Sequence, residues 1–191
     1  MPPSPKFTRE EIISAAFELV KKNGADSLTA RSLADALGSS PRPLFTVFEG
    51  MDEIRDGVVR KAKDVYLTYV NGGLNETIAF KGVGTSYIRF ASDEPQLFRL
   101  LFMSEMPDVP RIGYVLGMID ESYERILSSV ADGYGLDRAA ADELYRHLWI
   151  YTHGIAVLIA TGVCSFTGDE VSEMLTTVFK GVLTDIGSRQ K

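Results

Sequence analysis

Few side chains in this sequence are of the types that carry out covalent or metal chemistry. The chain has 191 residues, with two histidines and one cysteine. His147, His153 and Cys164 do not form a metal-ligand spacing such as His-Glu-x-x-His or paired Cys-x-x-Cys. The chain also has neither a Gly-x-Ser-x-Gly elbow nor a glycine-rich phosphate loop. We therefore expect a protein that is not an enzyme and has no cofactor or metal, and we expect Cys164 to be a buried, unreactive thiol.

The side chains best suited to non-covalent recognition lie in one short stretch. Arg42 stands near the start of an expected short helix, where an exposed guanidinium can donate two hydrogen bonds to O6 and N7 of guanine. The same group can instead contact phosphate or remain solvated. Ser39, Ser40 and Thr46 are candidate polar contacts. Pro43 either contacts a thymine methyl group or only shapes the helix. This is the chemistry of double-stranded DNA recognition.

A second group of residues is suited to binding a small apolar molecule. Trp149 and His153 are four residues apart, so they share one face of a helix. They form either the aromatic wall and polar handle of a pocket or a pair in the core. Aromatic and methionine side chains suit a roomy apolar site, and they equally suit an ordinary core. The further candidates for ligand binding are Tyr87, Phe98, Phe102, Met103, Met106, Tyr114 and Met118.

Helices must position these side chains, because no segment alternates strongly enough to predict a strand. Thr8 and Glu11 form a capping box at the start of a helix over residues 9–23. Thr29 caps a second helix over residues 30–37. The later helices are expected over residues 52–71, 76–92, 94–104, 110–134, 138–162 and 169–187. The predicted fold class is all-α, with a three-helix head followed by a ligand-binding and dimerisation domain of roughly six helices.

The third helix of the head follows a tight turn. Gly38 permits the turn, and Ser39 or Ser40 caps the helix. Pro41 lies in the first turn of the helix, where a missing N–H costs little. The inner face is expected to carry Leu44, Phe45 and Phe48. The second helix, the turn and the third helix form a helix-turn-helix whose exposed end is able to enter a major groove.

Three stretches of the head carry a family resemblance. Residues 28–38 read LTARSLADALG, and residues 44–48 read LFTVF and are followed by DEI at 52–54. Over residues 8–54 the chain resembles the DNA-binding domain of TetR-family transcriptional regulators. The first stretch matches the second helix and turn of that domain. The other two match the end of its recognition helix and the start of its fourth helix.

The second half of the chain resembles the same family. The Trp…His-Gly pattern at 149–154 resembles the signature of the WHG-type C-terminal domain, and residues 87–102 resemble the middle of that domain. The resemblance implies two domains. Residues 1–50 form a TetR-type helix-turn-helix DNA-binding domain, and residues 51–191 form an effector-binding and dimerisation domain.

The resemblance also implies a function. A homodimer through the last two long helices presents two recognition helices to a pseudo-palindromic operator, and a small apolar effector in the C-terminal domain releases the DNA. The expected protein is thus a ligand-responsive repressor. Thr29 and Arg31 match positions that contact phosphate, although Thr29 can serve only as the helix cap. The alternative is a small-molecule-binding protein with a weak head. It is motivated by Met51, where the family usually has lysine, and by Thr46 and Val47, where it often has tyrosine and histidine.

The distribution of charge limits how tightly such a head holds DNA. The net charge is -6, from 26 acidic and 20 basic residues, and residues 1–50 hold equal numbers of both. The acidic surplus therefore lies beyond Gly50, and the neutral head predicts a modest affinity that falls quickly with salt. No stretch approaches the roughly 20 apolar residues that a bilayer requires, and no secretory signal is present. We expect a cytoplasmic protein without a membrane partner.

Overall fold

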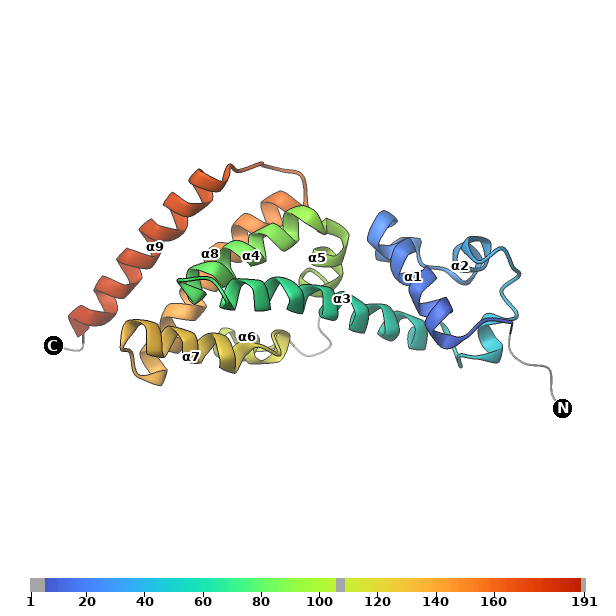
Figure 1. Ribbon diagram of the computed structural model, residues 1–191, viewed down its shortest axis with the longest axis horizontal. Coiled ribbons are helices and arrows are strands. Elements are labelled where there is room, and N and C mark those ends of the chain that lie inside the picture. The colour runs from blue at the N-terminus through green and yellow to red at the C-terminus, as the bar shows by residue number, and fades with distance from the viewer. Residues whose placement is uncertain (1–5, 106–108, 190–191) are drawn as a thin grey trace. The chain divides into compact units, whose positions relative to one another are not determined.

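The computed structural model describes residues 6–105 and 109–189, apart from the side chains of residues 118 and 119. Within these residues the chain forms nine α-helices and two short 3₁₀ helices and has no strand. This confirms the all-α prediction. Figure 1 shows how the α-helices follow one another along the chain. Across the described part, each helix is too short or too polar to cross a bilayer. The helices pack into two compact units, which we describe separately; the domain boundary at residue 50 stays a prediction.

The first unit comprises residues up to 65 together with 96–104. It contains α1 (Arg9–Asn23), η1 (Ala25–Ser27), α2 (Ala30–Ala36), η2 (Leu44–Thr46), the start of α3 (Met51–Leu74), and α5 (Pro95–Phe102) without its first residue. Helix α1 has the predicted bounds, because the Glu11 carboxylate accepts from the Thr8 N–H at 2.7 Å and the Glu11 N–H donates back to the Thr8 hydroxyl. Ile12 and Leu33 are fully buried in the core of this unit.

Residues 40–48, called the recognition segment below, do not form the α-helix that the sequence predicts. The Leu44 N–H donates to the Pro41 carbonyl at 3.1 Å, and the Thr46 N–H donates to the Pro43 carbonyl at 3.3 Å. Both hydrogen bonds span three residues, which is the spacing of a 3₁₀ helix. Each proline lacks an N–H and disfavours the α conformation in the residue before it, so only the short η2 forms.

The altered backbone also changes one predicted core position. Leu44 and Phe48 are buried as expected, but Phe45 is 45% exposed. The Phe48 N–H donates to the Leu44 carbonyl at 3.0 Å, so these two residues share the face that packs inward. Phe45 lies on the outer side of this turn, and the prediction that it faces the core is wrong.

The second unit comprises residues 66–95 and those from 105 onward. It contains the end of α3, α4 (Ala79–Asp93), α6 (Ile112–Ile119), α7 (Tyr123–Tyr134), α8 (Arg138–Ala160) and α9 (Gly168–Arg189). Helix α8 packs against α4, α7 and α9 and is therefore the centre of the unit. The core between α4, α8 and α9 is formed by Ile88, Ile155, Val171 and Leu175.

The single helix that the sequence predicts over residues 110–134 is broken in two. Asp120 has extended backbone angles and ends α6, and α7 begins at Tyr123. The Asp120 carboxylate accepts the Ser122 N–H at 2.8 Å and the Tyr66 hydroxyl at 2.8 Å. A side chain that bonds to a nearby backbone N–H competes with the helical hydrogen bonds, and this competition explains the break.

Two glycines let α3 and α4 approach each other closely. A Cβ atom placed on Gly73 would lie 2.6 Å from the carbonyl carbon and oxygen of Gly82 and from the Val83 nitrogen. These are backbone atoms, which cannot rotate away as a flexible side chain can. The absence of a side chain at Gly73 is therefore what allows this packing distance, and α4 depends on it for its position.

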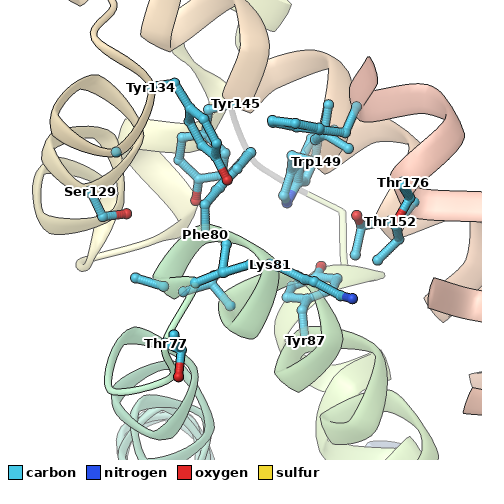
Figure 2. A pocket seen from close by; sticks show the side chains of 18 of the residues that line it. Thr77, Phe80, Lys81, Tyr87, Ser129, Tyr134, Tyr145, Trp149, Thr152 and Thr176 are labelled. Carbon is cyan, nitrogen blue, oxygen red and sulfur yellow. The ribbon is translucent and has the colours of Figure 1, made fainter. Parts of the chain in front are cut away.

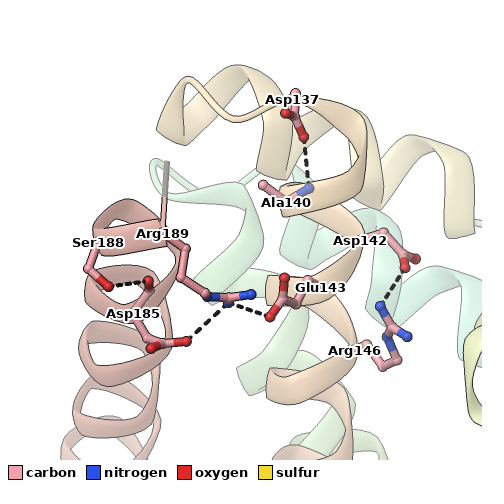
Figure 3. Close-up of polar contacts among 8 residues, drawn as sticks. All are labelled: Asp137, Ala140, Asp142, Glu143, Arg146, Asp185, Ser188 and Arg189. Carbon is pink, nitrogen blue, oxygen red and sulfur yellow. Dashed lines mark hydrogen bonds and ion pairs between the residues drawn. The ribbon is translucent and has the colours of Figure 1, made fainter. Parts of the chain in front are cut away.

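Helices α8 and α9 are also joined by polar contacts near the end of the described chain (Figure 3). The Arg189 guanidinium contacts the Glu143 carboxylate at 2.5 Å and the Asp185 carboxylate at 3.0 Å. The hydrogen bond from Arg189 lowers the pKa of Glu143. Because these side chains are partly exposed, the ion pairs contribute little to stability. The packing of α9 is therefore stabilised mainly by the apolar core.

Candidate functional site

The candidate DNA-contacting residues of the head lie at the start of α2, in the turn that follows it and on the recognition segment. Arg42, Ser40, Thr46, Arg31 and Thr29 are exposed, and Ser39 and Pro43 are half-buried. Some of their hydroxyls have structural partners. The Thr29 hydroxyl accepts from the Ser32 N–H at 3.1 Å and so caps α2, and the Thr46 hydroxyl donates to the Pro43 carbonyl at 2.7 Å. Among these side chains, the exposed guanidinium of Arg42 is best placed to contact another molecule.

Three other basic residues of the head are engaged within the protein. The Lys6 ammonium donates to the Ser39 hydroxyl at 3.0 Å, and the Arg55 guanidinium contacts the Asp52 carboxylate at 2.6 Å. Arg9 contacts three other residues of the protein. Because these cations are engaged within the protein, they are less available to contact phosphate groups of DNA.

Arg9 holds the end of the recognition segment against α1. Its guanidinium lies 4.2 Å from the centroid of the Phe48 ring, donates to the Val47 carbonyl at 3.0 Å and contacts the Glu53 carboxylate. The N–H of Glu49 also donates to Glu53, and this hydrogen bond together with Arg9 lowers the pKa of Glu53. The Arg9 side chain therefore connects the end of the recognition segment to the first turn of α3.

Replacing Arg9 with alanine is expected to loosen the recognition segment locally. The stacked ring contact and the carbonyl hydrogen bond together stabilise it by about 1 kcal/mol, given that the guanidinium is half exposed. Amide hydrogen exchange over residues 44–48 should quicken by roughly fivefold, with little change in α8. Lys22→Ala, which removes an exposed cation from the same helix, serves as the control. Equal exchange in both variants would show that Arg9 does not hold the segment.

The second unit encloses a cavity of about 720 Å³. Figure 2 shows aromatic and hydroxyl side chains from α4, α7, α8 and α9 converging on it. Its walls are mainly apolar and aromatic, with a few hydroxyls and two lysines. This size and lining are typical of sites for drug-sized molecules. The lining residues are Tyr66, Thr77, Ile78, Ala79, Phe80, Lys81, Val83, Gly84, Tyr87, Ser129, Gly133, Tyr134, Tyr145, Leu148, Trp149, Thr152, Leu175, Thr176, Phe179 and Lys180.

Three of the residues that the sequence singles out for ligand binding lie together here. Tyr87 and Trp149 line the cavity. His153 contacts both, because its ring stacks on Trp149 at 5.0 Å between centroids and its Nδ1 lies 2.9 Å from the Tyr87 hydroxyl. Burial lowers the pKa of His153 and raises that of Tyr87, so both side chains of this hydrogen bond favour their neutral forms. The pair fixes the Tyr87 ring in the cavity wall.

The other predicted ligand-binding residues lie elsewhere or outside the described residues. Phe98 and Phe102 pack against each other at 5.3 Å in the first unit, where Phe98 is fully buried. Their helix turns its apolar face into that unit, so they belong to a different core from Tyr87. Among the described residues that form the cavity, neither they nor the exposed Met103 and Tyr114 take part. Met106 and the side chain of Met118 lie outside the described residues.

Several lining residues were not anticipated from the sequence. Phe80 meets Tyr145 edge-on at 5.8 Å, and Tyr134 packs on Phe179 at 4.8 Å. Lys81 and Lys180 are further lining residues from α4 and α9. A helical apolar period does not distinguish these positions from ordinary core, so no signal in the sequence separates a cavity wall from packed interior.

The remaining residues of types that bind metals or act as nucleophiles lie apart from the cavity lining. Cys164 is exposed, so the prediction of a buried thiol is wrong; it follows α8 in a loop that begins at Gly162. Among the described residues, no three His, Cys, Asp or Glu side chains are placed to hold a metal ion. The cavity, by contrast, brings several polar groups together.

A buried carboxyl supports one side of the cavity. Asp120 accepts the hydroxyl of Tyr66, whose ring lines the cavity and packs against Phe90 at 5.4 Å. Burial raises the pKa of Asp120, although the N–H of Ser122 and the Tyr66 hydroxyl both act in the opposite direction. The folded chain therefore keeps this proton at pH values where the unfolded chain has released it.

This raised pKa predicts how stability depends on pH. The contribution of Asp120 is fully present below the ordinary carboxyl pKa of about 4 and is lost as the pH rises through the raised value. Asp120→Asn mimics the protonated form and should lack this loss, so the variant gains stability relative to the wild type as the pH increases. Urea unfolding followed by circular dichroism across this range measures the difference. Asp132→Asn, at an exposed carboxylate, is the control. Parallel pH curves for Asp120→Asn and wild type would contradict the prediction.

The cavity lies almost entirely within a segment that matches a known family. The model of the Tetracyclin repressor-like C-terminal domain matches residues 80–181, which is more than half of the chain. The chain belongs to the TetR family of transcriptional regulators. This confirms the resemblance drawn from the sequence, and members of the TetR family bind DNA and dimerise.

Individual proteins resemble the chain over most of its length. An HTH-type transcriptional regulator of Mycobacterium tuberculosis is 27% identical over 168 residues, which cover 83% of this chain and 72% of that protein. A TetR-family member from Streptomyces coelicolor A3 has a TM-score of 0.57 at 17% identity, covering 92% of this chain and 98% of its own. Apo ActR from Streptomyces coelicolor has a TM-score of 0.53 at 21% identity, covering 98% and 99%. These two structures support the TetR fold.

Proposed function

We propose that this TetR-family chain is a ligand-responsive repressor that leaves a pseudo-palindromic operator when a small molecule binds its C-terminal domain. The observation that carries the proposal is the cavity of about 720 Å³ within the family's C-terminal domain. A regulator that needed no effector would have no use for an empty volume of this size, because filling it with side chains would stabilise the fold. The coupling requires only that the effector binds the DNA-incompetent state more tightly than the DNA-bound state.

The exposed side of the recognition segment supplies the proposed DNA contacts. Arg42 is the candidate for reading guanine, and Ser40 is an exposed polar neighbour. Phe45, which the sequence placed in the core, is exposed and offers a ring for a thymine methyl group. The proposed phosphate contacts are Thr29, Arg31, Ser39 and Thr46, with Pro43 shaping the segment. Because several cations of the head are engaged within the protein, few remain to neutralise phosphate, and this favours a modest affinity.

A face of α8 supports the proposed homodimer. Ile150 and Leu158 are 48% and 38% exposed, and the exposed Gly154 lies midway between them. The spacing of four residues places all three on one side of the helix, and a glycine there lets another helix approach closely. Apolar side chains on an exposed face favour burial against a partner. On α9, Val178 and Val182 are only half-buried.

Replacing Gly154 with glutamate is expected to separate the dimer. No atom lies within 4 Å of a Cβ placed at Gly154, so the monomer fold accepts the new side chain. Two carboxylates buried against each other across a two-fold axis would cost several kcal/mol. Light scattering after size exclusion should therefore report a monomer. Ala139→Glu, at an exposed position on the same helix, should remain dimeric. A dimeric Gly154→Glu would place the interface elsewhere.

Helix α3 is the proposed route from ligand to DNA. It contributes Tyr66 to the cavity, and its first turn contributes Glu53 to the contacts of Arg9. A ligand that displaces the Tyr66 ring acts on the same helix that anchors the recognition segment. Such a displacement would alter the spacing of the two heads in a dimer, and DNA would be released.

The proposal is tested by a gel shift on DNA flanking the protein's own gene. The dimer should bind a site at low salt, lose it steeply as salt increases, and lose it at fixed salt when a cavity ligand is added. Compounds that copurify with the protein, identified by mass spectrometry, provide the first ligands. Absence of any bound site at low salt would reject the repressor function.

A second candidate is a small-molecule-binding protein with a weak head. It is favoured by the 3₁₀ geometry of the recognition segment and by the absence of a lysine at Met51. A ligand-dependent rise in melting temperature, without DNA binding at any salt concentration, would select this candidate over the repressor.

A further inference from the structure

The cavity differs in charge from the rest of its domain. The 20 acidic residues beyond Gly50 give this part of the chain its negative surplus. Among the described residues that line the cavity there is no aspartate or glutamate, and the charged members are Lys81 and Lys180. Two cations without an anion among these lining residues favour a local positive potential, which is opposite in sign to the net charge of residues 51–191.

The two lysines are associated with one face of α9, Lys180 as part of that helix and Lys81 from α4. The Lys81 ammonium reaches from α4 to the Ser172 hydroxyl on α9, at 3.0 Å. Ser172, Thr176 and Lys180 follow each other at intervals of four residues, so they lie along one face of α9 over roughly 12 Å. The Thr176 hydroxyl donates to the Ser172 carbonyl at 2.6 Å, which leaves the ammonium groups as the strong donors of this side.

Aromatic rings form the wall that faces these donors. Figure 2 shows the rings of Phe80, Tyr134, Tyr145 and Trp149 gathered around the cavity, with the Lys81 side chain extending past them. Phe80 meets Tyr134 at 6.4 Å and Tyr145 at 5.8 Å between ring centroids, both edge-on. A wall of this kind favours an apolar or aromatic body, because rings pack in offset or edge-on arrangements.

We infer that the effector is an anionic aromatic amphiphile, such as an arylalkanoic acid, whose carboxylate lies at the side of the cavity that carries Lys81 and Lys180 while its ring packs on the aromatic wall. The inference rests on the proposed effector function of the cavity. The buried carboxyl of Asp120 does not offset the two lysines, because it accepts the Tyr66 hydroxyl and only Tyr66 lines the cavity. A cationic ligand of the same shape would meet like charges and no counter-ion.

Three matched probes test the charge preference. Phenylhexanoate, phenylhexanol and phenylhexylammonium share a body and differ in the end group. Trp149, the single tryptophan of the chain, lines the cavity, so its fluorescence measures binding directly. The acid should bind on the order of tenfold more tightly than the alcohol, and the ammonium compound should bind least tightly. Equal or tighter binding of the alcohol or the ammonium compound would overturn the inference, as would no binding of any probe.

A double variant assigns the preference to the two lysines. Lys81→Met with Lys180→Met should abolish the advantage of the acid over the alcohol. Both side chains are exposed, so the fold should tolerate the change. Lys22→Met, a lysine outside the cavity, should behave as wild type. A retained preference in the double variant overturns the inference. If the acid is preferred through the lysines but does not release DNA, the ligand class stands and the proposed repressor mechanism fails.

Discussion

Replacing Gly73 with alanine is expected to lower the melting temperature by about 10 °C. The new Cβ would lie 2.6 Å from backbone atoms of Gly82 and Val83, which is closer than carbon atoms approach. Relief requires α3 and α4 to separate, and overpacking of this kind costs about 3 kcal/mol. For a chain of this size that cost corresponds to the stated fall in melting temperature.

The neighbouring glycine provides a matched control. Gly72 lies in the same helix, yet a Cβ placed there meets no atom within 4 Å. Gly72→Ala should therefore be neutral or stabilising by up to about 1 kcal/mol, because alanine is the better helix former. Thermal unfolding followed by circular dichroism compares the two variants. Similar melting temperatures for both would mean that the close approach of α3 and α4 is not required for stability.

Gly73→Ala should also disturb the cavity. Val83 and Gly84 line it and lie next to Gly82 on α4, so moving α4 shifts one wall. The Gly73→Ala variant that remains folded at low temperature should therefore bind phenylhexanoate more weakly than Gly72→Ala does. Unchanged binding would indicate that the strain is absorbed by the end of α3 alone.

Arg42→Ala is expected to weaken specific DNA binding by tens of fold. A guanidinium that donates two hydrogen bonds to guanine contributes about 1–3 kcal/mol of discrimination, and the head has few other exposed cations to compensate. The exposed position of Arg42 on the recognition segment means that its removal should leave the fold intact. Fluorescence anisotropy with the operator, at one fixed salt concentration, measures the loss.

Two further variants separate base reading from charge. Arg42→Lys keeps the positive charge but loses the paired donors, so it should remain weak if guanine is read and recover if only phosphate is contacted. Arg55→Ala removes a cation that is paired with Asp52, and its effect should be small. Equal losses for Arg42→Ala and Arg55→Ala would show that the position of Arg42 is not special.

The elements predicted best are those fixed by local interactions. The capping box of Thr8 and Glu11 and the glycine after Asn23 define α1, and the predicted and observed bounds agree. The family resemblance of the head likewise rests on a contiguous stretch. The prediction of a recognition helix was wrong because Pro41 and Pro43 outweigh an otherwise helical pattern. Both prolines are visible in the sequence.

The break between α6 and α7 had a different cause. Asp120 ends α6 while its carboxylate holds the hydroxyl of Tyr66, a residue 54 positions earlier in the chain. A window of local sequence does not contain this partner. The prediction of one continuous helix over 110–134 therefore followed the apolar period correctly and still missed the break.

The sequence by itself determined the helical fold class, the family and the exposed position of Arg42, since these depend on short-range patterns. Only the tertiary structure decided which aromatic residues enclose a cavity. Tyr87 and Trp149 line it, whereas Phe98 is buried in another core, although all three have the same periodic signature. The packing of α4, α7, α8 and α9 leaves space on one side of some rings and fills it on others. That difference arises from how helices meet, as the approach of Gly73 to Gly82 illustrates, and not from the period of any single helix.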